Sequence, residues 1–349
     1  MNRPKQILVP SLVRIKSGAL SRLGLYCRRE GHEKVLVMES AGLPEAVTRA
    51  ASSGFEAQGI ETARLTVTDN DFEDAARIFA DLPKKLSAIV GLGGGKALDM
   101  AKYVAFLARL PYYAAPTSLS NDGFCSPQSS LTVGGRRRSL AAALPRGVIV
   151  DLDACLAAPK LLWLSGVGDL VSKLTAVADW KLAFHHAGEP VDDLAALLSD
   201  ATVRQFLSNP GFDAQGTGLL ATALMLNGIA MEICGSSRPA SGSEHLLSHA
   251  LDAISARPRL HGLQVGVATY IVSRLQGAQS EVIDGLFQAT GFWEAVCADP
   301  FSREEWLQAA RLAPTIKDDF FTVLSLRDCV AEIEGVIDGD KALLYCYTR

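Results

Sequence analysis

The feature that most constrains the fold of this chain is a regular alternation of short apolar, β-rich runs with helical stretches between Lys34 and about Thr117. The β-rich runs read KVLVME, ARLTV, SAIVGLG and YYAAPT, and the helical stretches between them read EAVTRAASSG, DFEDAARIFADL and KALDMAKYVAFLARL. This alternation predicts βαβ units and therefore a parallel sheet. Further along, Gly134 and Gly135 separate two extended runs, which predicts a β-hairpin followed by one more strand.

The second half of the chain has a different character. Beyond Asp153, long amphipathic stretches such as DLVSKLTAVADWKLAFHH and GTGLLATALMLNGIAMEICG follow one another without β-rich runs between them, which predicts a helical region. With 349 residues the chain exceeds the roughly 250 to 300 residues at which single cores stop growing. Because Pro159 interrupts the chain before the first of these helices, we expect two domains, residues 1–157 and 158–349.

Charge and composition exclude several classes of partner. The chain has 34 basic and 38 acidic residues and a net charge of -4, so it lacks the basic surface that nucleic-acid binding needs. The N-terminal stretch MNRPKQILVPSL lacks the apolar core of a signal peptide, and we expect no apolar stretch near the roughly 20 residues that span a bilayer. Seven widely spaced cysteines with no CxxC pair predict reduced thiols. A cytoplasmic protein without membrane insertion is expected.

A run of glycines, GLGGGKALDMAK, directly follows an apolar run and precedes a helical stretch. A strand, a glycine turn and a helix N-terminus offer free backbone N–H groups to a phosphate, so the pyrophosphate of a dinucleotide is our preferred ligand. Lys96 occupies the place of the last glycine of GxGxxG, and Ala97 replaces the Ser or Thr of a Walker A loop. The alternative is a tight turn that only needs a positive φ. Glu39, at the end of KVLVME, is a candidate for the ribose hydroxyls or simply a solvated carboxylate.

Polar side chains gather after the next β-rich run, in APTSLSNDGFCSPQSSL. Open parallel sheets bind ligands just outside the carboxyl ends of their strands, so these side chains are candidates for a binding site. The alternative is a hydrogen-bonded loop that merely caps the sheet. The residues concerned are Thr117, Ser118, Ser120, Asn121, Asp122 and Ser126.

A candidate metal site combines three segments of the second half. In SGSEHLLSHALD, Ser241 and Glu244 form a capping-box pattern, which predicts a helix start there. His245 and His249 then lie four residues apart on one face of that helix, and His261 begins a further predicted helix. Asp169 is expected to open another helix. One Asp and two His around a divalent ion leave open positions, as in catalytic zinc sites; the alternatives are structural histidines and a carboxylate favoured by a helix dipole.

These residues together resemble the sn-glycerol-1-phosphate dehydrogenase family, within the group that includes dehydroquinate synthase, glycerol dehydrogenase and the iron-dependent alcohol dehydrogenases. The resemblance covers about Lys34 to Leu324 and depends on GGGKALDMAK, PTSLSNDGFCSP, GDLVSKLTAVADWKLA, and SGSEHLLSHALD followed by HGLQVG, in that order. It implies a Rossmann-like NAD(P)-binding domain over 1–157 and an all-helical metal- and substrate-binding domain over 158–349.

The family resemblance also implies roles for individual residues. Asp169, His245 and His261 are the expected metal ligands, and Asp122 and His249 are the expected catalytic contacts near the reacting hydroxyl. Asp169 would also contact the substrate. The expected cofactor-binding residues are Glu39, Gly93, Gly94, Gly95, Lys96, Asp99, Thr117, Ser118, Ser120 and Ser126.

The implied reaction is reversible reduction of dihydroxyacetone phosphate to sn-glycerol 1-phosphate, with NAD or NADP and one divalent metal, for which zinc is preferred and nickel and iron are the alternatives. Lys317, Lys173 and the arginines of the GGRRR hairpin are candidate cations for the substrate phosphate. Asn121 departs from the histidine that many family members carry there. This departure leaves the substrate of the chain open. The alternative functions are a dehydroquinate-synthase-like lyase, a dehydrogenase of another phosphorylated polyol and a catalytically silent nucleotide-binding module. A homo-oligomer is expected.

Overall fold

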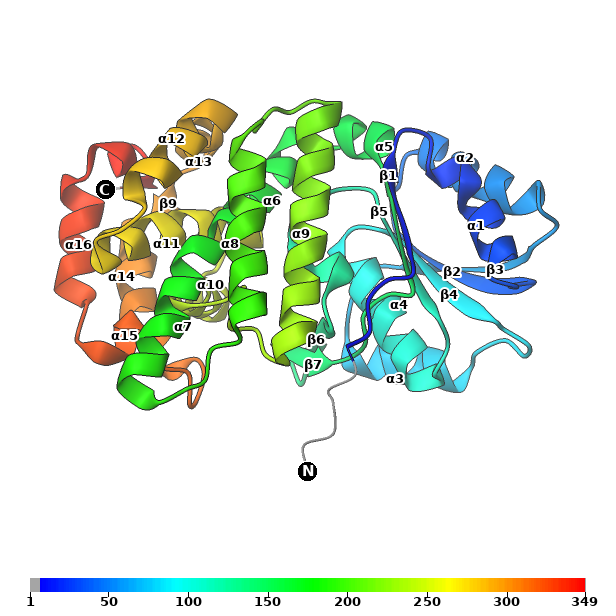
Figure 1. The fold of residues 1–349 in the computed structure, drawn as a ribbon, viewed down its shortest axis with the longest axis horizontal. Helices are drawn as coiled ribbons and strands as arrows, with labels where there is room; N and C mark the ends of the chain where they lie inside the picture. Colours follow the sequence, from blue (N-terminus) through cyan, green and yellow to red (C-terminus); the bar gives the residue numbers. More distant parts are fainter. Residues whose placement is uncertain (1–6, 349) are drawn as a thin grey trace. The chain divides into compact units, whose positions relative to one another are not determined.

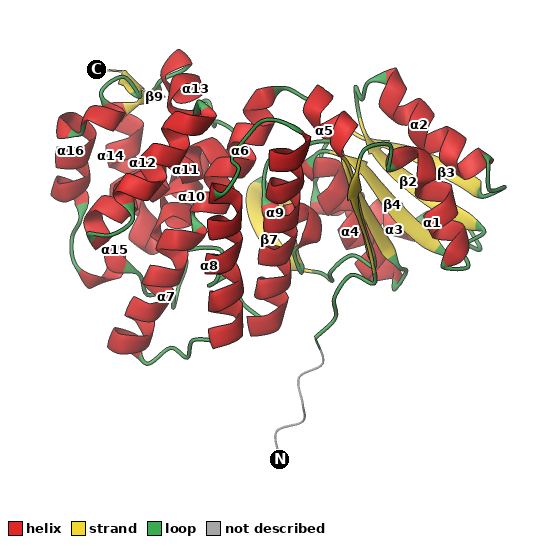
Figure 2. Ribbon diagram, turned by 45° about the horizontal axis from the view of Figure 1, so that its top comes forward, coloured by secondary structure: helices red, strands yellow, loops and turns green. Residues whose placement is uncertain are grey.

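The computed structural model describes residues 7–348, and the chain divides into two compact units, Met1–Pro159 and Lys160–Arg349. The first part of MNRPKQILVPSL lies outside the described residues. Figures 1 and 2 show strands confined mainly to the first unit and helices dominating the second.

The first unit is built around a six-stranded sheet in the order β1-β8-β5-β4-β2-β3, in which every neighbouring pair is parallel. The predicted βαβ pattern is therefore confirmed, and so is the hairpin β6–β7, which is followed by strand β8. The elements are β1 (Leu12–Lys16), α1 (Leu23–Arg29), β2 (Lys34–Ser40), α2 (Glu45–Glu56), β3 (Glu61–Val67), α3 (Phe72–Ala80), β4 (Ala88–Gly93), α4 (Gly95–Ala108), β5 (Tyr112–Pro116), η2 (Asp122–Cys125), β6 (Gln128–Val133), β7 (Arg136–Ala141), β8 (Gly147–Asp151) and α5 (Leu152–Ala157).

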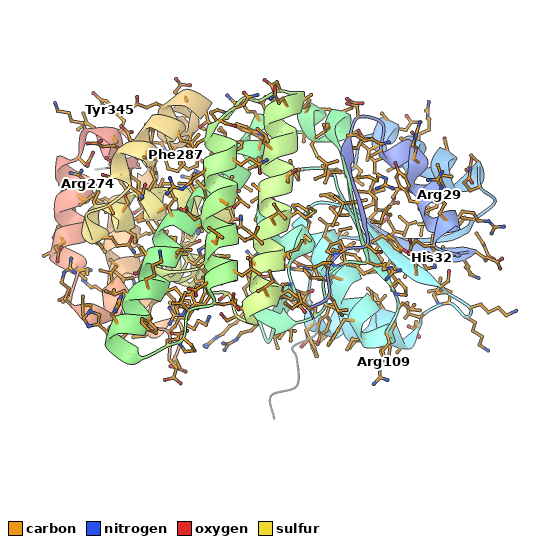
Figure 3. All side chains as sticks on the ribbon, viewed as in Figure 1. Arg29, His32, Arg109, Arg274, Phe287 and Tyr345 are labelled. Carbon is orange, nitrogen blue, oxygen red and sulfur yellow. The ribbon has the colours of Figure 1, made fainter. Side chains whose placement is uncertain are left out.

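Both faces of this sheet are covered, which explains why its inner strands read as continuous apolar runs. In β2, Val35 and Val37 pack with residues of α1 and α2, whereas Leu36 and Met38 pack with residues of α3 and α4 on the opposite face. Helix α4 ends at Ala108, and the C-cap residue Arg109 adopts a left-handed conformation with φ 54° and projects from the unit (Figure 3).

The second unit is helical apart from two short strands, β9 and β10, that pair in parallel. Its elements are α6 (Lys160–Val171), α7 (Lys173–Ala187), α8 (Asp193–Leu207), α9 (Ala214–Cys234), α10 (Ser243–Ile254), α11 (His261–Gln276), α12 (Ser280–Thr290), α13 (Phe292–Ala298), β9 (Phe301–Ser302), α14 (Arg303–Leu312), α15 (Val323–Leu326), α16 (Val330–Gly339) and β10 (Tyr347–Thr348). Phe287, labelled in Figure 3, stacks on Phe292 with 3.9 Å between ring centroids, which joins α12 to α13 in the core.

The structure differs from the sequence-based expectations at two apolar helical stretches and at the N-terminal strand. Two helical stretches, Lys160–Ala187 and Ala214–Cys234, are long and apolar enough by composition to cross a membrane, contrary to the expectation of no such stretch. Their most apolar windows are 78% and 56% buried inside the protein, so packing against neighbouring helices accounts for their composition. The N-terminal strand β1 was not predicted either, because the alternation of runs becomes regular only from Lys34.

Candidate metal centre and nucleotide-binding loop

The glycine run forms the turn between β4 and α4. Gly93 has φ 134°, and a Cβ there would lie 2.2 Å from Ser40 Oγ, so this position requires glycine. Gly94 is the N-cap residue of α4 and no side chain caps the helix, while its own N–H donates to Ser40 Oγ at 3.0 Å. A Cβ on Gly94 or Gly95 would meet nothing within 4 Å, so the open side of this turn has room for a ligand.

The structure brings several of the predicted cofactor-binding residues around one small cavity next to this turn. Gly95 and Asp99 from α4 line it together with Ser118, Ser120 and Asn121 from the loop after β5. That loop continues into η2, where Asn121 accepts a hydrogen bond from the N–H of Gly123 at 2.9 Å. Helix N-terminus and loop hydroxyls thus meet at the carboxyl edge of the sheet, as expected for a doubly wound fold.

Lys102 holds this loop in place, a role that the sequence did not suggest. Its side chain is fully buried, and Nζ donates to Gly123 O at 2.6 Å and to Gln128 O at 2.5 Å. Nζ also lies 3.3 Å from Ser126 Oγ and 3.5 Å from Asp99 Oδ1. Burial lowers the pKa of Lys102 and raises the pKa of Asp99.

The other predicted cofactor-binding residues have different surroundings. Glu39 forms an ion pair with Arg64, and exposed Lys96 pairs with Asp69 at 2.9 Å. Thr117 is buried and donates its N–H to Gly93 O at 3.0 Å. Ser126 is buried and donates to Gln128 O at 2.9 Å, so it shapes the loop from inside.

Three donors gather in the second unit. Asp169, His245 and His261 each offer one ligand atom, and these atoms lie within 4.8 Å of one another. Asp169 Oδ1 is 3.6 Å from His245 Nε2 and 4.0 Å from His261 Nε2. Asp169 and His245 are buried and His261 is half-buried, so a carboxylate and two imidazoles face one another out of bulk solvent. This donor set fits a divalent ion with open coordination positions.

Close helix packing brings these donors together. A Cβ on Gly168 would lie 2.0 Å from Gly262 O, and a Cβ on Gly262 would lie 1.8 Å from Ser165 O, so both positions require glycine. Helices α6 and α11 therefore approach closely at the point where Asp169 follows Gly168 and His261 precedes Gly262. Gly168 and Gly262 thus allow the backbones of α6 and α11 to contact each other.

Two local expectations about these helices are corrected. Asp169 does not open a helix; it lies in the last turn of α6, three residues after Gly166, and the helix dipole does not favour a carboxylate there. The capping box does not form either: the N-cap of α10 is Gly242, and Glu244 Oε1 accepts from the Gly242 N–H at 2.6 Å. The predicted start of α11 at His261 is confirmed.

Buried partners hold the second nitrogen of each histidine. His245 Nδ1 lies 2.9 Å from Glu244 Oε1, and His261 Nδ1 lies 3.3 Å from Ser248 Oγ. Ser248 in turn accepts from Gln264 Nε2 at 3.1 Å. Such outer partners fix the orientation and tautomer of metal-binding imidazoles. Sequence reasoning missed them, because Glu244 was interpreted as a cap.

Burial and neighbouring polar groups shift the pKa values of Asp169 and His245 in opposite directions. Burial alone would raise the pKa of Asp169, but the Lys173 ammonium and His245 outweigh it and hold that pKa well below its usual range. Burial alone would lower the pKa of His245, but hydrogen bonds with Asp169 and Glu244 raise it. Asp169 is therefore a carboxylate at neutral pH, as a metal ligand must be.

The remaining candidate residues are also placed. The half-buried His249 ring lies 5.9 Å from the His261 ring, centroid to centroid, and is nearly parallel to it. Asp122 is half-buried at the start of η2. Lys317 Nζ donates to Ser237 Oγ at 3.1 Å, and burial lowers its pKa to about 8. Lys173 is fully buried against Asp169, so its ammonium is not exposed to a phosphate.

The arginine hairpin and the paired histidines of α7 lie at the surface. Strand β7 is exposed along most of its length, and Arg137 Nε donates to Ser130 Oγ at 2.6 Å. His185 and His186 are exposed at the end of α7.

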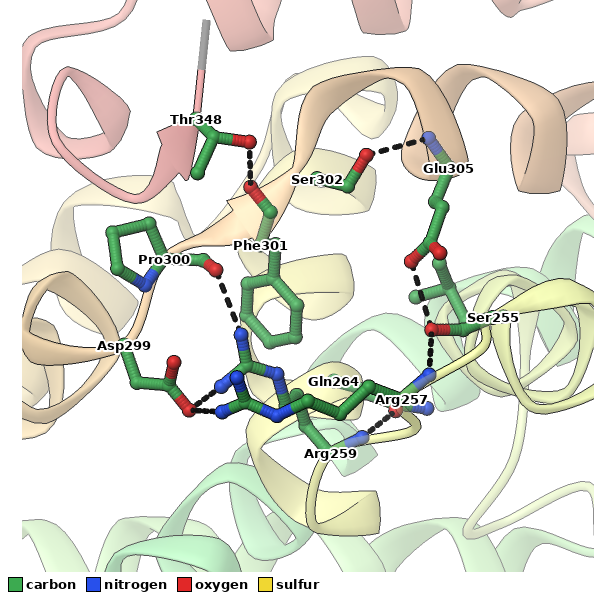
Figure 4. A pocket seen from close by; sticks show the side chains of 11 residues that line it. Ser255, Arg257, Arg259, Gln264, Asp299, Pro300, Phe301, Ser302, Glu305 and Thr348 are labelled. Atoms are coloured by element: carbon green, nitrogen blue, oxygen red, sulfur yellow. Dashed lines mark hydrogen bonds and ion pairs between the residues drawn. The ribbon is translucent and has the colours of Figure 1, made fainter.

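A larger cavity of about 350 Å³ lies beside the metal-site helices and is drawn in Figure 4. Arg257 and Arg259, from the loop that leads to His261, both form ion pairs with Asp299 there. Gln264 links this loop to the metal site: its Oε1 accepts from the Arg259 N–H at 2.8 Å while its Nε2 reaches Ser248. The cavity therefore shares a hydrogen-bond chain with His261.

Asp179 is expected to make the stability of the second unit depend on pH. Burial first, and then the Glu244 carboxylate, raise the pKa of Asp179 to about 6. Because the folded-state pKa exceeds the unfolded value, the folded protein binds the extra proton at low pH, and this stabilisation is lost as the pH rises through 6. We expect the difference in unfolding free energy between wild type and Asp179→Asn to fall by about 1 kcal/mol from pH 5 to pH 7. Denaturant titrations of metal-free protein at both pH values measure it, and a constant difference would contradict it.

Comparisons with known proteins agree in both sequence and fold. The family model described as iron-containing alcohol dehydrogenase matches residues 14–159. A glycerol-1-phosphate dehydrogenase (NAD(P)+) of Thermofilum pendens is 38% identical over 79% of this chain and 81% of its own length. The enzyme of the same name from Methanothermobacter thermautotrophicus is 33% identical over 94% of this chain and 96% of its own length.

Among solved structures, a glycerol dehydrogenase from Schizosaccharomyces pombe is similar with a TM-score of 0.75, at 17% identity over 96% of this chain and 91% of that one. A probable glycerol dehydrogenase from Sinorhizobium meliloti has a TM-score of 0.73 at 18% identity, over 95% of this chain and 98% of that one. These likenesses confirm the expected fold class, a Rossmann-like α/β unit followed by a helical one.

Proposed function

The chain belongs to the glycerol-1-phosphate dehydrogenase family, and we propose that it catalyses the reversible, NAD(P)-linked reduction of dihydroxyacetone phosphate to sn-glycerol 1-phosphate. The family predicted from four ordered motifs is confirmed, and with it a metal-dependent NAD(P)-linked oxidoreductase. The observation that carries the proposal is the cluster of Asp169, His245 and His261, because these three residues would hold the divalent ion that acts as the electrophile in a carbonyl reduction.

Residues of the first unit would bind the coenzyme. The turn at Gly94 and Gly95 has room for a pyrophosphate beside the N-terminus of α4, and Ser118 and Ser120 line the adjoining cavity. Glu39 remains our candidate for the ribose hydroxyls, with Arg64 beside it. Lys96 and Asp99, and the loop that Thr117 and Ser126 support, complete the proposed coenzyme site.

Residues of the second unit would bind the metal and the substrate. A divalent ion held by Asp169, His245 and His261 would polarise the C2 carbonyl, and the nicotinamide would supply the hydride. His249 is our candidate for delivering the proton to the C2 oxygen, directly or through water, because its half-buried ring lies beside His261. Asp122 and Lys317 remain candidates for the substrate hydroxyl and phosphate.

We propose zinc as the resident ion, although carboxylate and imidazole ligands also suit nickel and iron. The coenzyme is NAD or NADP, with no preference predicted. We also predict a homo-oligomer and a cytoplasmic location.

The test is oxidation of NADH and of NADPH with dihydroxyacetone phosphate, on metal-stripped protein before and after zinc, nickel or iron is added. We expect turnover to return with zinc and the product to be the sn-1 enantiomer. Unphosphorylated dihydroxyacetone, run in parallel, should react far more slowly because it lacks the phosphate. No turnover by metal-loaded protein would contradict the proposed substrate. Retained metal binding in that case would favour the dehydroquinate-synthase-like lyase or another phosphorylated polyol.

A further inference from the structure

We propose that two buried charges of opposite sign tune the metal affinity of this site: Glu244 strengthens it by positioning His245, and Lys173 weakens it by competing for Asp169. The inference rests on the metal centre of the proposed function. Glu244 and Lys173 lie outside the candidate ligand set, and both belong to the second unit.

Glu244 is held rigidly in the interior. Its side chain is fully buried, Oε1 accepts from the Gly242 N–H at 2.6 Å, and Oε2 accepts from Thr175 Oγ1 at 2.8 Å. The same Oε1 lies 2.9 Å from His245 Nδ1. When Nδ1 carries the proton and donates it to this carboxylate, Nε2 keeps its lone pair and faces Asp169. The negative charge also makes the imidazole a better donor to a cation.

Lys173 acts on the other ligand. Its side chain is fully buried on α7, and Nζ lies 3.4 Å from Asp169 Oδ1 and 3.3 Å from Ala240 O. Oδ1 is the same oxygen that lies nearest to His245 Nε2 and His261 Nε2. The Lys173 ammonium and a divalent ion would therefore both interact with Asp169 Oδ1, and the two cations would repel each other. Metal binding must work against the Asp169–Lys173 pair.

The two residues consequently predict changes of opposite sign. Glu244→Gln keeps the shape of the side chain but removes its charge, so zinc affinity should fall by about 10- to 100-fold. Lys173→Met keeps the length of the side chain but removes the competing charge, so zinc affinity should rise by about tenfold or more. A loss of packing alone would lower the affinity in both variants, which separates tuning by charge from a merely structural role.

The experiment measures zinc dissociation constants of the metal-stripped proteins by competition with a chromophoric chelator. Lys181→Met is the matched control for lysine, because Lys181 is exposed on the same helix α7, and exposed Glu304 on α14 gives the matched Glu304→Gln control. Both controls should bind zinc like the wild type. If a stripped variant does not fold, zinc release from metal-loaded protein to excess chelator replaces the titration. Release should then be faster for Glu244→Gln and slower for Lys173→Met.

The outcomes separate this inference from the proposed function. Wild-type protein that binds no zinc, nickel or iron would overturn the metal centre itself. Wild-type protein that binds metal while both variants are unchanged, or both are weakened, would overturn only the tuning by Glu244 and Lys173.

Discussion

Replacing Asp169 with Asn is expected to abolish tight metal binding and, with it, turnover. Asp169 is the one carboxylate of the ligand set, and Lys173 and His245 hold its pKa well below the usual range against the effect of burial. Loss of an electrophilic metal is worth several kcal/mol of transition-state stabilisation, so kcat/KM should fall on the order of a thousandfold or more. Bound metal, measured by elemental analysis after gel filtration, should fall in parallel. His245→Ala should behave in the same way.

The Asp169→Asn experiment needs a control for folding. Asp169 also neutralises the buried ammonium of Lys173, and breaking a buried ion pair costs about 3–5 kcal/mol. The double variant Asp169→Asn/Lys173→Met removes both charges and should recover much of this stability while remaining free of metal. Circular dichroism melts of the two variants measure the recovery. A folded Asp169→Asn protein with full metal content and activity would show that Asp169 is not a ligand.

The sequence predicted the framework well because the signals it used are local. The short apolar, β-rich runs KVLVME and SAIVGLG and the glycine pair at Gly134 and Gly135 specify strands and a hairpin without information from distant residues. Burial of both faces of β2 is visible in the same continuous apolar run. The candidate metal ligands were reached in two steps: residue types and spacing suggested Asp169, His245, His249 and His261, and the family resemblance then selected Asp169, His245 and His261.

What the sequence did not show depends on side-chain contacts that only the folded structure defines, both between adjacent residues and between distant segments. Glu244 precedes His245 by one residue, so no helical periodicity places the two side chains together, yet the structure joins them at 2.9 Å. Gly168 and Gly262 lie on different helices, and only their packing explains why each must be glycine. Lys102 lies within α4, the helix that follows the glycine run, and its role in holding the loop at Gly123 appears only in three dimensions.

Alanine substitutions in the glycine turn between β4 and α4 are expected to have contrasting effects on stability: one should destabilise the protein strongly, and the two at neighbouring positions should not. Gly93→Ala would place a Cβ 2.2 Å from Ser40 Oγ at a residue with φ 134°. The clash and the strained backbone together should cost on the order of 3 kcal/mol of stability. Gly94→Ala and Gly95→Ala add a Cβ to open space, so they should fold as well as the wild type.

The KM for the coenzyme then shows whether the glycine turn binds the pyrophosphate or serves only the backbone. If the pyrophosphate approaches the backbone at Gly94 and Gly95, a Cβ there blocks it, and the KM for NADH or NADPH should rise about tenfold or more while the melting temperature is unchanged. Gly335→Ala, in helix α16 with nothing within 4 Å of the added Cβ, is the matched control and should leave the KM unaltered. Well-folded Gly94→Ala and Gly95→Ala proteins with wild-type coenzyme affinity would mean that the turn serves only the backbone, and that the coenzyme binds elsewhere on the sheet edge.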